Sequence, residues 1–167
     1  MIKETGTDML GFGKSKEHSI VAVCDGIVKS LDDVNDKVFS DRILGDGCAI
    51  VPHGNVICSP GEGEVISVAE TGHAYCIGLV SGAEVLVHIG IDTVALKGEG
   101  FTKKVNEGEK VYPGKAIAEV DLDLLKNEGY DTTVITIITN TDDVGRMTVN
   151  YEAVKGGVSP SIVYKMK

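Results

Sequence analysis

The stretch that decides the fold runs from residue 71 to residue 100 and reads TGHAYCIGLVSGAEVLVHIGIDTVALKGEG. Its segments AYCIGLV (74–80) and AEVLVHI (83–89) are rich in strand-forming residues. Ser81 and Gly82 between them are typical of a tight turn, because glycine readily adopts a positive φ. The sequence therefore predicts an antiparallel β-hairpin with a two-residue loop.

The predicted loop also sets the register of the hairpin. If Val80 faces Ala83, Tyr75 lies opposite His88, and His73 lies diagonal to His88 on the same face. Diagonal neighbours are about 7 Å apart, so two imidazoles are predicted side by side. A three-residue loop would break this register, because a slip of one residue turns a side chain to the other face. The opposite face is expected to be apolar and to join the core, with Ala74, Cys76, Val85, Val87 and Ile89.

Length and composition favour one all-β domain. The 167 residues can form one sizeable core, and short β-branched runs are separated by many of the 21 glycines. Strand patterns begin at Ile20, so we expect a flexible tail over residues 1–19 and a single domain over residues 20–167. DLDLLKNEG (121–129) predicts a short helix with an aspartate cap, and residues 92–96 predict one further helical turn.

Charge and cysteine content exclude several classes of protein. The net charge of −9 argues against a nucleic-acid partner, since phosphates require basic patches. No apolar run approaches the length of a membrane span, so no stable membrane insertion is expected, and the N-terminal residues lack the charged-then-apolar order expected of a signal peptide. The cysteines lack C-x-x-C spacing, which predicts small, reduced core residues in a cytoplasmic protein. They are Cys24, Cys48, Cys58 and Cys76.

The histidine pair allows more than one chemistry. A neutral imidazole is a good nucleophile and can accept a phosphoryl group, while a second imidazole can donate a hydrogen bond to the phosphoryl oxygens. Thr71, two residues before His73, could orient that ring. The pair could instead bind zinc, with Asp92 as the nearest carboxylate, but zinc needs three or four ligands. No H-x-H or H-E-x-x-H motif is present.

The segment LDDVNDKVFSDRILGDG (31–47) is predicted to be a polar loop, yet it contains several apolar residues. They could fill a local core, or they could form an exposed patch that binds a partner. Both interpretations stay open from the residues alone. The residues concerned are Val38, Phe39, Ile43 and Leu44.

The hairpin and its surroundings resemble one protein family closely. TGHA (71–74), VHIGIDTV (87–94) and LKGEGF (96–101) are similar to the glucose-family IIA component of the bacterial phosphoenolpyruvate-dependent sugar phosphotransferase system. The likeness extends to GDGCAI (45–50) and DLDLL (121–125), and it covers about residues 20–167. This resemblance implies a compact antiparallel β-sandwich with one or two short helices.

The resemblance also implies a function. A cytoplasmic phosphocarrier of this kind accepts a phosphoryl group from the carrier HPr on His88 Nε2 and passes it to a cysteine of the IIB domain for sugar uptake. His73 would support transfer, Thr71 would tether His73, and the acidic residues Asp36 and Asp92 could meet basic residues of HPr. No cofactor is implied, although the histidine pair could hold zinc adventitiously or within a complex. The implied apolar ring around the site comprises Val38, Phe39, Ile43, Leu44, Leu86 and Val94.

Three alternatives are weighed beside this one. A biotinyl- or lipoyl-type carrier needs a lysine at a hairpin tip, which neither SPGEGEV (59–65) nor NEGEKVYPG (106–114) offers. A zinc-dependent hydrolase on a related β-sandwich would need a third ligand. A regulatory binding protein, read by its phosphorylation state, is compatible with the phosphocarrier.

Overall fold

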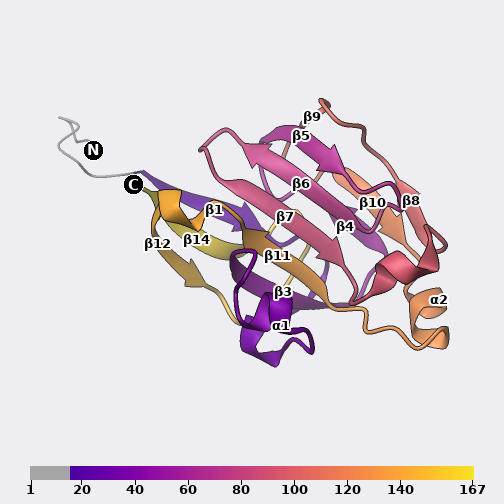
Figure 1. The fold of residues 1–167 in the computed structure, drawn as a ribbon. Helices are drawn as coiled ribbons and strands as arrows, with labels where there is room; N and C mark the ends of the chain where they lie inside the picture. The colour runs from indigo at the N-terminus through magenta and orange to yellow at the C-terminus, as the bar shows by residue number, and fades with distance from the viewer. Residues whose placement is uncertain (1–15) are drawn as a thin grey trace, which may run out of the picture.

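A computed structural model describes residues 16–167 of the chain, and these residues form the predicted antiparallel β-sandwich (Figure 1). One layer is an eight-stranded sheet. Its strands, in spatial order, are β13 (Ala153–Val154), β2 (Gly26–Lys29), β3 (Asp46–Pro52), β11 (Val134–Ile138), β7 (Glu84–Ile89), β6 (Ala74–Leu79), β5 (Gly63–Val68) and β9 (Lys110–Val111).

Two three-stranded sheets complete the sandwich. The main core lies between them and the large sheet, because Ile20 of β1, Ile57 of β4 and Val87 of β7 are fully buried in one cluster. Among residues 16–167, no helix is long and apolar enough to cross a membrane. The small sheets have the orders β1 (Glu17–Val21), β14 (Pro160–Met166), β12 (Val144–Val149) and β4 (Val56–Cys58), β10 (Ala116–Val120), β8 (Phe101–Lys103).

The hairpin of β6 and β7 is present, but the predicted register is wrong by one residue. Ala74, and not Tyr75, lies opposite His88. The backbone N–H of Leu79 donates to the Ala83 carbonyl at 2.9 Å and closes a three-residue loop over residues 80–82. Gly82 in this loop has a φ of 102°, which explains the glycine.

The shifted register exchanges the two faces of β6. Tyr75 and Ile77 are fully buried and join Val85, Val87 and Ile89 of β7 in the core. Ala74 and Cys76 lie on the other face and are only partly buried, so their predicted place in the core is wrong. The other three cysteines are buried as predicted: Cys24, Cys48 and Cys58.

The predicted polar loop contains a 3-10 turn η1 (Leu31–Asp33) and a short helix α1 (Lys37–Ser40). The Asp36 carboxylate accepts the Val38 N–H at 2.9 Å and so caps α1. The loop covers part of the outer face of the large sheet, where it forms a second buried cluster. Its members are Leu31, Val34, Phe39, Ala49, Ile91, Ile135 and Ile137.

The predicted helix is confirmed as α2 (Leu122–Asn127), capped by the Asp121 side chain. The further helical turn expected over residues 92–96 is the 3-10 turn η2 (Thr93–Leu96), and the side chain of Asp92 does not cap it. Another 3-10 turn, η3, spans Thr141–Asp143. Residues 17–19, expected in the tail, pair with β14 as the start of β1, because their backbone completes the edge of that sheet. Residues 1–15 of the expected tail lie outside the described residues.

Candidate histidine site

The two predicted histidines lie side by side at the end of the β6–β7 hairpin. Their ring centroids are 5.1 Å apart, and the ring planes meet at 84°. Regular alternation along β6 would place His73 on the core face with Tyr75. Instead, Gly72 has a φ of 75° and the chain bends before β6 begins, so the side chain of His73 reaches His88. The predicted pair is therefore present, but a bend and not the predicted register brings it together.

A backbone carbonyl determines the tautomer of His88. The Nδ1 atom lies 2.9 Å from the Gly90 carbonyl oxygen. A carbonyl can only accept a hydrogen bond, so Nδ1 carries the proton of the neutral ring. The lone pair is then on Nε2. His88 is thus a neutral imidazole with its nucleophilic nitrogen free of this hydrogen bond.

Gly90 is a site residue that sequence analysis missed. Its φ is 77°, and a Cβ atom at this position would clash with the Thr93 methyl group. The backbone N–H of Gly90 donates to the Thr133 carbonyl at 2.9 Å. The backbone N–H of Ile91 donates to the Asp131 carbonyl at 3.0 Å. These bonds fix the turn whose carbonyl orients His88. The available signal was a glycine directly after a predicted strand.

Thr71 makes the contact with His73 that sequence analysis expected. Its Oγ1 lies 2.6 Å from His73 Nδ1. The turn that carries both residues is tied down by Lys103, whose Nζ donates to the Glu70 carbonyl at 2.9 Å. The ring of His73 is therefore held at one nitrogen, which leaves its Nε2 available to a group on His88.

Burial favours the neutral form of both imidazoles. Desolvation lowers the pKa of His73 below its ordinary value of 6.5. Desolvation also lowers the pKa of His88, and repulsion from a charged His73 lowers it further. The Gly90 hydrogen bond and the carboxylates of Asp36 and Asp92 act in the opposite direction on the pKa of His88, but they are the smaller effects. A neutral His88 is the form that can act as a nucleophile.

The predicted apolar ring divides into buried and exposed members. Phe39 is buried, and its ring packs against His88 with centroids 5.0 Å apart. The expectation that Phe39 belongs to an exposed ring is therefore corrected: it supports His88 from the second cluster. Leu86 is partly buried and packs against the same cluster. The exposed members are Val38, Ile43, Leu44 and Val94.

A metal site at the histidine pair would need further ligands from the described residues around it. Within residues 16–167, no group of three or more His, Cys, Asp or Glu side chains is placed to hold a metal ion. Two imidazoles supply fewer ligands than a protein zinc site normally has. The geometry therefore gives the zinc-hydrolase alternative no support.

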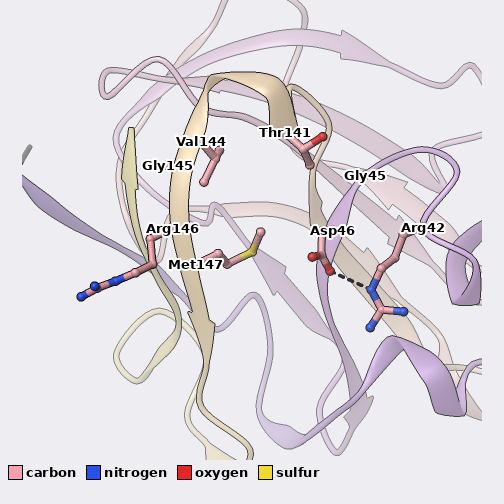
Figure 2. Close-up of a pocket in the computed structure, with 8 residues that line it drawn as sticks. All are labelled: Arg42, Gly45, Asp46, Thr141, Val144, Gly145, Arg146 and Met147. Atoms are coloured by element: carbon pink, nitrogen blue, oxygen red, sulfur yellow. Dashed lines mark hydrogen bonds and ion pairs between the residues drawn. The ribbon is translucent and has the colours of Figure 1, made fainter. Parts of the chain in front are cut away.

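A cavity of about 430 Å³ lies away from the histidine pair, between β12 and the start of β3 (Figure 2). None of the predicted site residues lines it. Arg42 at its edge donates to Asp46 at 3.1 Å and to Asp32 at 2.8 Å. Figure 2 shows Arg146 pointing away from this ion pair. These contacts anchor the exposed segment that follows α1 and contains Ile43.

A β-sandwich that holds two imidazoles side by side suits a histidine phosphocarrier, the class of protein in which an imidazole nitrogen takes up a phosphoryl group. Residues 18–144 match the family model described as phosphoenolpyruvate-dependent sugar phosphotransferase system, EIIA 1. The chain belongs to this family.

Three relatives illustrate the match. The glucose-specific EIIA component of Bacillus cereus is 40% identical over 151 residues, which are 89% of this chain and 92% of the relative. The β-glucoside-specific EIIBCA component of Bacillus subtilis is 45% identical over 117 residues, 70% of this chain but 19% of that longer protein. The solved structure of glucose permease IIA from Mycoplasma capricolum has a TM-score of 0.83 at 36% identity, covering 88% of this chain and 96% of that one.

Proposed function

We propose that this chain accepts a phosphoryl group from HPr on His88 Nε2 and passes it to the IIB domain of a sugar permease. The observation that carries the proposal is the hydrogen bond from His88 Nδ1 to the Gly90 carbonyl, which leaves the lone pair on Nε2. In the first step this lone pair attacks phosphorus, a new N–P bond forms, and the N–P bond of the donor phosphohistidine breaks. In the second step a cysteine sulfur of IIB takes the same group, and His88 returns to neutral imidazole.

His73 is proposed to stabilise charge on the group in transfer. Its ring meets His88 edge to face, and its Nδ1 is engaged by Thr71. When the Thr71 hydroxyl donates to Nδ1, the proton of His73 lies on Nε2 and can be donated to a phosphoryl oxygen. Thr71 therefore acts through His73, as its tether.

The surface around the pair supports protein partners. The exposed apolar side chains of Val38, Ile43, Leu44 and Val94 form the docking rim, the name kept below for these four residues. Asp36 and Asp92 add negative charge close enough to act on the pKa of His88 and suit a basic partner surface. A IIB partner is further supported by the Bacillus subtilis relative, whose name joins IIB, IIC and IIA in one component.

The proposed place of action is the cytoplasm. The four cysteines of the chain are all free, as expected in a reducing compartment. Phosphoryl transfer of this kind needs no cofactor, because donor, imidazole and acceptor supply every bond that changes.

The test supplies enzyme I, HPr and phosphoenolpyruvate with a labelled phosphoryl group to the protein. It then measures how much of the labelled phosphoryl group the protein takes up. His88→Ala should lose labelling, while His53→Ala, a change at an exposed histidine in a turn, should label like the parent protein. Labelling of His88→Ala at an unchanged level would refute His88 as the acceptor. Loss of labelling in both variants would show a general defect and count against the assignment as well.

A further inference from the structure

The carbonyl that orients His88 lies in a turn that needs support. Gly90 and Asp92 have φ values of 77° and 61°. Left-handed backbone is less favourable for a residue with a side chain, although aspartate tolerates it better than most, so contacts within the turn stabilise Asp92 in this conformation. Asp92 makes no side-chain capping hydrogen bond to η2. The support must come from other residues of the turn.

Thr93 supplies such a contact. Its side chain is fully buried, and its hydroxyl donates to the Ile89 carbonyl at 2.5 Å. This hydrogen bond closes the turn from residue 89 to residue 93, with Gly90 inside the closed ring. Its methyl group also lies within clashing distance of the place that a Cβ of residue 90 would take, so the turn packs tightly around Gly90.

We propose that Thr93 is a positioning residue that sets the tautomer of His88 through Gly90. Without the Thr93 hydroxyl, the buried Ile89 carbonyl loses a hydrogen bond and the turn relaxes to satisfy it. The Gly90 carbonyl then moves from the 2.9 Å position at which it accepts the Nδ1 proton of His88. The proton can shift to Nε2, and a ring protonated there cannot attack phosphorus with that nitrogen. The consequence for transfer rests on the proposed function, whereas the tautomer does not.

The chain offers a matched control in Thr136 of β11. Thr136 is also fully buried, but its hydroxyl has no hydrogen-bond partner among residues 16–167. Replacing either threonine by valine removes one buried hydroxyl and keeps the shape of the side chain. Only the change at position 93 removes a hydrogen bond to the turn.

The experiment measures the nitrogen-15 shifts of His88 and the initial rate of phosphorylation by phospho-HPr. In Thr93→Val the Nε2–H tautomer should grow and the rate should fall roughly five- to tenfold, the effect of one ordinary hydrogen bond. Thr93→Ser, which keeps the hydroxyl, and Thr136→Val should match the parent protein in both measurements. If Thr93→Val does not fold, Thr93→Ala removes the same hydroxyl and carries the same expectation.

An unchanged His88 tautomer in the folded Thr93→Val or Thr93→Ala protein would overturn the proposal. So would a tautomer shift of equal size in Thr93→Ser, because the methyl group would then be responsible. If the parent protein takes no phosphoryl group on His88, the proposed function fails. A tautomer shift in Thr93→Val alone would still support the positioning role.

Discussion

The rings of His73 and His88 meet edge to face, at 84° and 5.1 Å between centroids. This arrangement gives the two imidazoles different surroundings. His88 is held by a carbonyl that can only accept a hydrogen bond, and His73 by a hydroxyl that can donate or accept one. One ring is therefore prepared as a nucleophile and its neighbour as a donor of hydrogen bonds.

His73→Gln should separate acceptance from delivery. The variant keeps His88 and its Gly90 hydrogen bond, so it should still be labelled by phospho-HPr. Delivery should slow by roughly a hundredfold, because the glutamine amide cannot become positively charged and does not place an N–H where His73 Nε2 lies. Single-turnover transfer from the labelled protein to a purified IIB domain checks this, and normal delivery would refute the role of His73.

Thr71→Val should have a milder effect in the same direction. It removes the 2.6 Å contact to His73 Nδ1 and frees the ring to rotate. We expect delivery to fall roughly three- to tenfold, in line with one hydrogen bond. Thr71→Ser keeps the hydroxyl and should restore delivery in the same assay; a serine variant as slow as the valine variant would contradict the tether.

The titration of His88 should show the effects of burial and of its neighbour. Its pKa is lowered mainly by desolvation and next by His73, so its midpoint in an NMR titration should lie below 6.5. His73→Gln removes the neighbouring charge and should raise that midpoint. A midpoint at or above 6.5 in the parent protein, or a lower one in His73→Gln, would contradict this account of the site.

The same pKa shift predicts how stability depends on pH. Between the lowered pKa of folded His88 and the ordinary 6.5 of the unfolded chain, the unfolded state binds more protons. The contribution of His88 to the free energy of unfolding therefore falls as pH is lowered through this window and is constant below it. Urea titrations should show a weaker pH dependence in this window for His88→Gln than for the parent protein.

Phe39 and Ile43 should behave differently although both lie in one apolar loop. Phe39 is buried against His88, so Phe39→Ala should lower the free energy of unfolding by about 3–5 kcal/mol. Ile43 is 66% exposed, so Ile43→Ser should change stability by less than about 0.5 kcal/mol.

Ile43, the exposed residue of the two, should contribute to the binding of the IIB domain. We expect Ile43→Ser to weaken the IIB complex about fivefold or more, measured by calorimetry, because it removes an exposed apolar side chain of the docking rim. Val158→Ser is the control, since Val158 is 65% exposed and lies outside the docking rim. Equal affinity losses in both variants would contradict a specific rim.

Sequence analysis predicted the all-β class, the helix after Asp121 and the histidine pair. Strand-forming runs and a capping aspartate are local signals, and they carry the class and the helix. The histidine pair was expected from a register that is wrong, and the bend at Gly72 brings it together. The hairpin register was wrong because Ser81 and Gly82 suit loops of two or three residues equally well. The Ser81 side chain meets Tyr164 of β14 at 2.6 Å, a contact between residues 83 positions apart that no local pattern indicates.

The division of the apolar loop also depended on distant residues. Phe39 is buried because Ile135 and Ile137 of β11 lie in the same cluster, whereas Ile43 finds no such cover. Both have the same apolar character in the sequence. The tautomer of His88 likewise depends on a carbonyl group, and the sequence identifies only the glycine that carries it.

The most direct test of the account locates the phosphoryl group on the intact protein. Protein labelled by phospho-HPr is mapped by mass spectrometry, and the attached nitrogen is identified by nitrogen-15 and phosphorus-31 NMR. The account predicts a single phosphoryl group on Nε2 of His88, opposite the nitrogen that donates to Gly90. A group on His73, or on Nδ1 of His88, would contradict it.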